Sequence, residues 1–239
     1  MISIIGNIKI NDLQRLKYLK TTLWSFELLK EYQLLLNIDC NCITLDEITT
    51  EVEKIGFKNY QLSNESGNYG EIYCKLLYLV KSDYVINFFE DHFLLLDDKK
   101  QLESILMDMK INKVDVCKSS FWQIEQNSKT TIYKIQKENC IFINDLSNFN
   151  QYQKYYGSRY YIGVNFITTL EFAKRFWNRK FNSNRPHEWE IAKFSKEFEH
   201  IAMIPDVEIF CSVEDNHGEI GTSLLERKEY KFWNIYNNL

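Results

Sequence analysis

The chain has 239 residues, of which 45% are hydrophobic and 26% are charged. A chain of this length buries enough apolar surface to fold without disulfides or a structural metal. Its composition is close to the average of soluble globular proteins, which argues against long disordered segments. Its formal net charge of −4 at pH 7 and its scattered lysines offer no general attraction for nucleic acid, so no nucleic-acid partner is expected.

The cysteines and the longest apolar runs bear on where the protein works. Six cysteines show no CxxC pair, and no apolar run approaches the roughly 18 residues that span a bilayer. The N-terminus also lacks the pattern of a signal peptide. We therefore expect a cytoplasmic protein without a transmembrane segment, either free or associated peripherally with the inner face of the membrane. Two prolines, eight glycines and the lack of a linker-like stretch predict a single domain over residues 1–239.

The first half of the chain alternates between two hydrophobic patterns. Continuous apolar runs predict buried strands over residues 1–10, 32–39 and 84–89. Apolar residues at helical spacing predict helices over residues 13–26, 46–58, 72–80 and 98–112. Asn11 and Asp12 supply a cap for the first helix, and the polar residues 60–69 predict a loop. The strand–helix–strand order predicts an α/β fold with a Rossmann-like, mostly parallel central sheet flanked by helices.

The second half of the chain has a more mixed pattern. Apolar and β-branched runs predict strands over residues 114–122, 130–135, 141–143 and 202–210. Helical spacing predicts two helices, over residues 168–177 and 188–199. The last residues, 223–239, alternate charged and aromatic side chains and predict no defined element. We therefore expect the fold to end in a C-terminal elaboration of helices and loops.

Polar side chains follow two of the predicted buried strands. Asp39 ends the second strand, and Glu90, Asp91 and His92 follow the strand of residues 84–89. In open α/β sheets, ligands bind beyond the carboxyl ends of the strands. Three consecutive ligating side chains are costly to bury without a partner, and carboxylate and imidazole groups suit a divalent cation that bridges phosphate oxygens. A solvated turn rich in acids is the simpler alternative for this segment.

Residues 82–95, with the sequence SDYVINFFEDHFLL, resemble the metal-binding strand end of GT-A glycosyltransferases. In that family an apolar strand runs into a D-x-D motif, whose two ligand positions correspond here to Glu90 and His92. The chain departs from the motif because its first acid is glutamate and its last position is histidine. Relatives that transfer N-acetylgalactosamine to polypeptides also have histidine at the last position. The resemblance implies that Glu90, Asp91 and His92 bind Mn²⁺ or Mg²⁺, with Asp91 also placed against the donor and either Asp91 or Glu90 as the effective acid.

Other segments of the first half are similar to the same family. Residues 15–26, with the sequence RLKYLKTTLWSF, resemble the first helix of the common inverting, family 2-like enzymes. These enzymes place an acid after the second strand to hold the base or the ribose, a role that the resemblance implies for Asp39. The segment from Asn68 to Gly70, followed by a helix with Lys75, resembles the part that lies over the donor, where Lys75 would face the pyrophosphate. The alternatives are an ordinary strand end for Asp39 and a solvated helix face for Lys75.

The second half carries the candidates for the catalytic base and for the last metal ligand. In the family, the catalytic base lies near the start of a helix beside the acceptor, and residues 185–190, with the sequence RPHEWE, are the best match to it in this chain. Either Glu188 or Glu190 is the candidate base. A helix N-terminus favours acids through its dipole, which is the alternative explanation for both. Residues 214–223 resemble the C-terminal segment that closes over the donor. His217 would complete the metal shell there, and an ordinary loop histidine is the alternative.

The resemblance implies a GT-A fold in which residues 1–100 bind the nucleotide sugar and residues 101–239 form the acceptor-binding half and the C-terminal segment. It implies a metal-dependent glycosyltransferase that uses a UDP- or GDP-sugar and a glycan or lipid-linked acceptor, with inversion, in polysaccharide or glycoconjugate biosynthesis. A nucleotidyltransferase is one alternative, but residues 4–7 (IIGN) are too poor in glycine for its phosphate-binding loop. The other alternative is a non-catalytic sugar- or nucleotide-binding relative.

Overall fold

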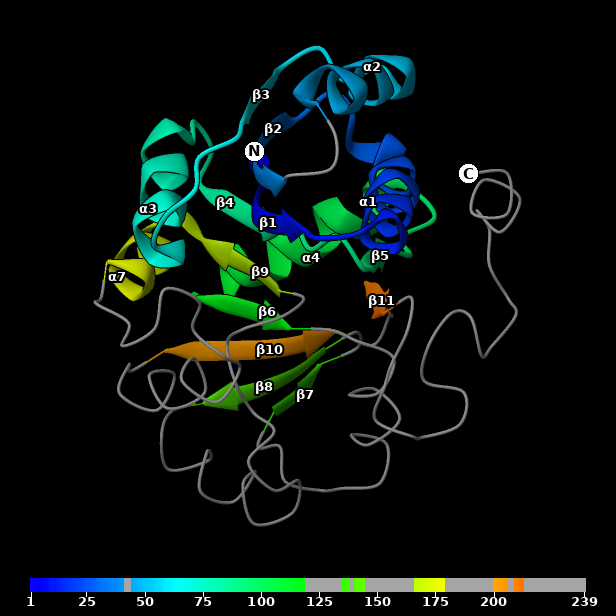
Figure 1. The fold of residues 1–239 in the computed structure, drawn as a ribbon. Coiled ribbons are helices and arrows are strands. Elements are labelled where there is room, and N and C mark those ends of the chain that lie inside the picture. The colour runs from blue at the N-terminus through cyan, green and yellow to red at the C-terminus, as the bar shows by residue number, and fades with distance from the viewer. Residues whose placement is uncertain are drawn as a thin grey trace, which may run out of the picture.

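The computed structural model describes residues 1–40, 44–118, 135–137, 140–144, 166–178, 200–205 and 209–212. The strands are β1 (Ile2–Ile10), β2 (Gln33–Cys40), β3 (Tyr60–Ser63), β4 (Tyr84–Asn87), β5 (His92–Leu94), β6 (Val116–Lys118), β7 (Ile135–Lys137), β8 (Cys140–Asn144), β9 (Phe166–Thr169), β10 (Ile201–Pro205) and β11 (Phe210–Ser212). The helices are α1 (Leu13–Ser25), the 3-10 turn η1 (Glu27–Leu29), α2 (Leu45–Ile55), α3 (Tyr69–Leu79), α4 (Lys99–Ile111) and α7 (Leu170–Trp177). The described strands form a nine-stranded sheet in the order β3-β2-β1-β4-β9-β6-β10-β8-β7 and a smaller sheet of β5 and β11 (Figure 1).

β1 lies at the centre of the parallel part of the large sheet. It pairs in parallel with β2 on one side and with β4 on the other, and β3 adds a further parallel strand beyond β2. Along β1 every residue is buried except Lys9, which is partly exposed. Helices cover both faces of the sheet, so β1 and β2 are continuous apolar runs rather than alternating ones. The strands predicted over residues 1–10 and 32–39 are confirmed.

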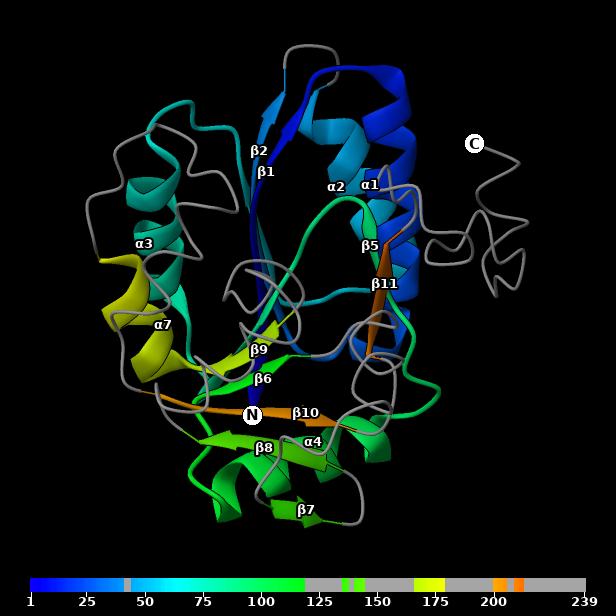
Figure 2. The same ribbon diagram turned by 90° about the horizontal axis from the view of Figure 1, so that it is seen from below.

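The helices cover the two faces of the sheet in separate groups (Figure 2). One apolar cluster joins the sheet to α1, α2 and α4 through residues such as Leu19, Val52 and Leu102. The other cluster joins the opposite face to α3 and α7 through Tyr73 and Trp177. The chain therefore leaves β1 on one face and enters β4 from the other. This makes the gap between β1 and β4 a topological switch point, the place where open α/β sheets bind ligands.

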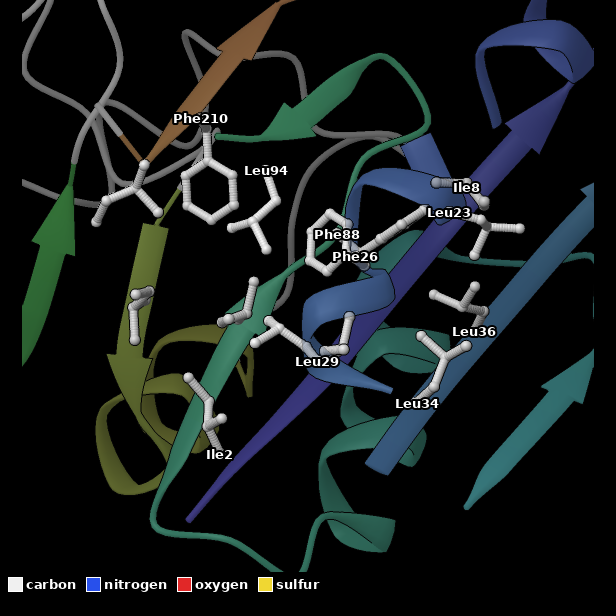
Figure 3. Packing of buried hydrophobic residues seen from close by; sticks show 14 of the residues in the cluster. Ile2, Ile8, Leu23, Phe26, Leu29, Leu34, Leu36, Phe88, Leu94 and Phe210 are labelled. Carbon is white, nitrogen blue, oxygen red and sulfur yellow. The ribbon is translucent and has the colours of Figure 1, made fainter. Parts of the chain in front are cut away.

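Aromatic packing fixes the segment after β4 against α1. Phe26, which follows α1, lies 5.1 Å from Phe88 and 6.5 Å from Phe210 between ring centroids, and Figure 3 shows Leu94 beside these rings. All three phenylalanines are buried. Because Phe88 directly follows β4 and Phe210 begins β11, this cluster holds the connection from β4 to β5 in place.

The structure corrects the loop predicted over residues 60–69, because its first four residues form β3. Leu34 to Asn37 of β2 pair in parallel with Tyr60 to Ser63. β3 lies at the edge of the sheet and its side chains are partly or fully exposed. It therefore lacks the apolar run that marks a buried strand. Pairing with β2, rather than the local sequence pattern, makes this segment a strand.

Two other boundaries differ from the prediction. The helix predicted from Thr168 begins at Leu170, because β9 precedes it and the Thr169 hydroxyl caps it by accepting the Phe172 N–H. The strand predicted over residues 84–89 ends two residues earlier, at Asn87. His92, predicted to follow that strand, begins β5.

The second half of the chain extends the sheet mainly through antiparallel pairs, although β10 pairs in parallel with β6. β9 pairs with β4 and β6, and β8 pairs with β10 and β7, all antiparallel. The α/β class with a mostly parallel central sheet flanked by helices is confirmed. The helix predicted over residues 188–199 and the segment 223–239 lie outside the described residues. Within the described part of the chain, no helix combines the length and the apolar character needed to cross a membrane.

Gly6 of β1 lies where the backbone after β4 comes closest. A Cβ atom at this position would lie 2.8 Å from the Phe88 carbonyl oxygen and 3.0 Å from Leu36 Cδ2. A backbone oxygen cannot move aside on its own, so Gly6→Ala is expected to lower the free energy of unfolding by about 1–3 kcal/mol, measured by urea denaturation. Gly67→Ala is the matched control, since its Cβ would meet Ile72 Cδ1 at an ordinary 3.6 Å. Equal losses in the two variants would contradict this steric explanation.

Candidate functional site

The turn that joins β4 to β5 lies at the switch point between β1 and β4. Phe88 extends the pairing of β4 with β1, because its N–H donates to the Ile5 carbonyl oxygen at 2.8 Å. The chain then turns at Glu90 and Asp91, and His92 begins β5. Two acids therefore stand just beyond the carboxyl end of a parallel strand.

Arg15, in the first turn of α1, binds both acids. Its Nη1 donates to Glu90 Oε1 and to Asp91 Oδ2, each at 2.9 Å. The Glu90 and Asp91 side chains are 14% and 23% exposed, whereas that of Arg15 is 42% exposed. α1 begins here because Asp12 caps it, as predicted, by accepting a hydrogen bond from the Arg15 N–H at 2.8 Å. The capped helix start thus delivers a guanidinium to two largely buried carboxylates, which need such compensation.

Two hydroxyl groups of α1 hold the backbone of this turn. The Thr22 hydroxyl donates to the Glu90 carbonyl oxygen at 2.6 Å, and the Ser25 hydroxyl accepts the Leu94 N–H at 3.0 Å. Arg15, Thr22 and Ser25 lie on one side of the helix, because intervals of seven and three residues return to the same face. Sequence reasoning missed all three as site residues. The signal available in the sequence was that three polar residues recur on one face of the first predicted helix.

His92 completes the set of polar side chains at the turn. Its Nδ1 lies 2.6 Å from Asp91 Oδ1, and its ring meets the ring of Phe89 edge-on at 5.7 Å between centroids. The pairing of β5 with β11 places His92 opposite Ser212. Asp91 therefore uses one carboxylate oxygen for Arg15 and the other for His92.

Burial and charge act on the two acids with opposite net results. Burial, followed by repulsion from Asp91, raises the pKa of Glu90 to about 7, although Arg15 opposes the rise. Burial also acts to raise the pKa of Asp91, but the contacts with His92 and Arg15 outweigh it and hold that pKa well below its usual range. Burial acts to lower the pKa of Arg15, and the two carboxylates reverse this to a net rise. At neutral pH Asp91 is ionised and Glu90 is close to the midpoint of its titration.

A second polar group lies in the carboxyl-terminal halves of β1 and β2. Asn37 Nδ2 donates to Asn7 Oδ1 and to the Glu65 carbonyl oxygen, both at 2.9 Å. Asn37 Oδ1 accepts from the Ser63 hydroxyl and the Glu65 N–H, both at 2.8 Å. Asn7 in turn donates to the Tyr69 carbonyl oxygen at 3.1 Å. These bonds attach the loop between β3 and α3 to the sheet.

The Asn37→Leu variant is expected to lower the free energy of unfolding by about 3 kcal/mol. Leucine has nearly the same volume but leaves the buried Asn7 amide, the partly buried Ser63 hydroxyl and the Glu65 backbone without their partner, and each buried loss costs about 1–3 kcal/mol. Urea denaturation measures the change. Ser63→Ala removes one of the same bonds, so its smaller expected loss, about 1 kcal/mol, serves as the control. Similar losses in the two variants would show that Asn37 does not anchor the loop.

The structure gathers most of the predicted donor-binding residues around this loop. Asp39 accepts a hydrogen bond from the Ser66 hydroxyl at 3.0 Å. Asn68 caps α3 by accepting from the first N–H groups of the helix, including that of Gly70 at 3.0 Å. Lys75 lies further along α3, where it is exposed and forms an ion pair on the helix surface. The roles of these residues in donor binding stay predictions.

Asn87, the last residue of β4, is a further polar residue that the sequence did not single out. Its Oδ1 accepts from the Tyr73 hydroxyl, and its side chain is only 2% exposed. Its Nδ2 finds no hydrogen-bond partner among the described residues. A buried amide N–H in this position favours an acceptor atom from water or from a ligand.

Among the predicted metal ligands, Glu90, Asp91 and His92 are close together but engaged with other partners. Glu188, Glu190 and His217 lie outside the described residues. The residues that the structure describes contain no cluster of three or more His, Cys, Asp or Glu side chains arranged to bind a metal. Two carboxylates and an imidazole suit Mg²⁺ or Mn²⁺ in kind. Arg15 and His92, however, contact Glu90 Oε1 and both oxygens of Asp91, so a cation would compete with these contacts.

No protein-family model and no curated protein matches the chain. Among solved structures, the chain is similar to residues 1–349 of S. aureus TarS, with a TM-score of 0.57 and 15% identity over 87% of this chain and 59% of that chain. The same fragment in complex with UDP-GlcNAc has a TM-score of 0.60 and 13% identity over 98% of this chain and 64% of that chain. Its complex with UDP has a TM-score of 0.57 and 14% identity, over 87% and 59% of the two chains.

The likeness to TarS, a GT-A glycosyltransferase, concerns the fold. The chain spans about three fifths of the length of the TarS fragment. An identity of 13–15% carries no information on substrate or activity. The chain has a GT-A-like fold, which confirms the fold implied by residues 82–95 and 15–26.

Proposed function

We propose that the protein is a glycosyltransferase that transfers a sugar from a UDP- or GDP-sugar to a glycan or lipid-linked acceptor, with inversion, in polysaccharide or glycoconjugate biosynthesis. The observation that carries the proposal is the pair of acids, Glu90 and Asp91, held with Arg15 at the switch point of a GT-A-like sheet. Such a sheet binds its ligand at this place. The TarS fragment has been solved with UDP and with UDP-GlcNAc, which supports a nucleotide-sugar donor.

The donor would lie across the carboxyl ends of β1, β2 and β4. Asp39, at the end of β2, would accept hydrogen bonds from the base or the ribose. Asn68 and Gly70 form the N-terminus of α3, where backbone N–H groups and the helix dipole favour negatively charged groups. Lys75 would contact the pyrophosphate after leaving its surface ion pair with Glu65.

The two carboxylates and the imidazole at the turn are ligand types that suit a divalent cation, with Mn²⁺ or Mg²⁺ as the candidates. Glu90, Asp91 and His92 would hold the cation, and His217 would complete its shell. When bound, such a cation supplies positive charge against the diphosphate leaving group. The α1 hydroxyl groups that bind the turn hold the backbone that carries these side chains.

The proton of the acceptor hydroxyl needs a base in the second half of the chain. Glu188 or Glu190 would accept this proton while the acceptor oxygen bonds to the sugar carbon and the bond from that carbon to the diphosphate breaks. A direct displacement of this kind inverts the configuration at the sugar carbon. Both residues lie outside the described part of the chain, so this assignment rests on the sequence resemblance.

Melting temperatures measured with UDP, GDP, CMP and dTDP species, with and without Mn²⁺, test the proposal. One nucleotide class is expected to raise the melting temperature by about 5–10 °C at about 100 times its Kd, and only with the metal. The wild type is then expected to hydrolyse the matching nucleotide sugar slowly in the absence of an acceptor. If no nucleotide shifts the melting temperature under any metal condition, the proposal fails. Binding without hydrolysis would favour a non-catalytic module, and pyrophosphate release from a nucleoside triphosphate would favour a nucleotidyltransferase.

A further inference from the structure

The contacts of Arg15 with Glu90 and Asp91 have a geometry that lets the guanidinium leave the two carboxylates. Both ion pairs are made by one nitrogen, Nη1, at 2.9 Å. The two-pronged geometry, in which two guanidinium nitrogens bind one carboxylate, is the stronger arrangement. At 42% exposure, the Arg15 side chain also has the most access to water of the three. Arg15 therefore compensates one of the two negative charges through contacts that it can exchange.

The turn keeps its position without help from Arg15. The Thr22 hydroxyl holds the Glu90 carbonyl oxygen at 2.6 Å, and the Ser25 hydroxyl holds the Leu94 N–H at 3.0 Å. These bonds fix the backbone on both sides of Asp91. The backbone that carries the two carboxylates consequently keeps its position when the guanidinium leaves them.

The balance of charge favours an exchange when a divalent cation arrives. Glu90 and Asp91 carry two negative charges when both are ionised, of which Arg15 neutralises one and a divalent cation neutralises both. The two compete for the site, because Arg15 contacts one oxygen of each carboxylate that a cation would use. A released guanidinium stays at the first turn of α1, beside the carboxyl end of β1, where the sheet places the phosphates of a nucleotide. Guanidinium groups bind phosphate as readily as carboxylate.

The geometry points to Arg15 as an exchangeable counter-cation of the candidate site, which holds Glu90 and Asp91 until a divalent cation takes them and then binds the diphosphate of the donor. This inference rests on the proposed function and adds Arg15 as a positioning residue that links binding of the cation to binding of the donor. Metal and donor then bind cooperatively, because the cation frees the guanidinium that the diphosphate uses.

Calorimetric titrations of the Arg15→Gln variant test the exchange in two parts. Mn²⁺ alone is expected to bind the variant at least about tenfold more tightly than the wild type, because no guanidinium competes for the carboxylates. UDP or GDP, added at saturating Mn²⁺, is expected to bind the variant at least about tenfold more weakly. Lys20→Gln, which makes the same charge change on the same helix, is the matched control and is expected to behave like the wild type. Unchanged or weaker Mn²⁺ binding by the Arg15 variant, or unchanged nucleotide binding, would overturn the inference.

A measurement on the wild-type protein covers the case in which the variant does not fold. The rate at which phenylglyoxal modifies Arg15, read by mass spectrometry of its peptide, is expected to rise with Mn²⁺ and to fall again when UDP or GDP is added. Equal rates in the three states would refute the exchange. If the wild type binds neither nucleotide at saturating Mn²⁺, the proposed function fails, while the response of Arg15 to Mn²⁺ alone still decides whether the guanidinium leaves the acids.

Discussion

The Asp91→Asn variant is expected to lose at least about 100-fold in Mn²⁺-dependent affinity for the nucleotide sugar, and at least as much in turnover. Loss of a residue that merely supports a metal ligand costs about 10–100-fold in affinity, so loss of a ligand charge costs at least as much. Asparagine has the same shape and keeps one acceptor oxygen for Arg15 or His92, so the fold is expected to survive. Calorimetry with Mn²⁺ and the donor measures the affinity, and the melting temperature checks the fold.

Asp83→Asn is the matched control for this prediction. Asp83 directly precedes β4, at the opposite end of the strand from the turn, and its side chain is 87% exposed. The same chemical change there is expected to leave donor affinity within about twofold of the wild type, because surface charges this far apart are largely screened. If Asp91→Asn binds the donor as well as Asp83→Asn does, Asp91 is not a metal ligand and the turn is an ordinary acidic exit from the strand.

The free energy of unfolding is expected to fall by about 3 kcal/mol as the pH rises from about 4.5 to about 7, through Glu90 alone. Burial, then repulsion from Asp91, raises the pKa of Glu90 from 4.5 to about 7 in the folded protein. Between these two pH values the folded state keeps a proton that the unfolded chain has already released. Raising the pH through this window therefore favours the unfolded chain, and above it the loss stays constant.

Urea denaturation at a series of pH values measures this dependence, and Glu90→Gln isolates it. Glutamine does not titrate, so the variant is expected to lose most of the decline. The lowered pKa of Asp91 acts in the opposite sense and at lower pH, since its stabilising contribution disappears as the pH falls below about 4. A decline of the same size in the wild type and in Glu90→Gln would show that Glu90 is not the group responsible.

Some elements follow from the sequence because their signal is local. β1 and β2 are continuous apolar runs, and α1 has a cap and a helical repeat that any short window of sequence contains. β3 and β9 carry no such signal. β3 is partly exposed at an edge of the sheet, and β9 becomes a strand because it lies between β4 and β6, which are distant in the chain.

Some residues of the candidate site are recognisable from the local sequence and others are not. Glu90, Asp91 and His92 are consecutive residues after an apolar run, so the sequence alone indicates a polar strand exit that can bind a ligand. Arg15 is separated from Glu90 by 75 residues, and no local pattern relates the two. The same holds for Thr22, which binds the Glu90 carbonyl across 68 residues.

The sequence by itself determined the α/β class, the main strands and helices of the first half, and the position of the acidic turn, because hydrophobic periodicity and capping depend on neighbours within a few residues. Only the tertiary structure decided which charges meet at that turn. The parallel pairing of β1 with β4 brings the start of α1 next to the end of β4, and this proximity gives the two acids a guanidinium partner and separates their pKa values. Such contacts depend on how segments far apart in the sequence pack together, and the local pattern of residue types carries no information on the distance between those segments in space.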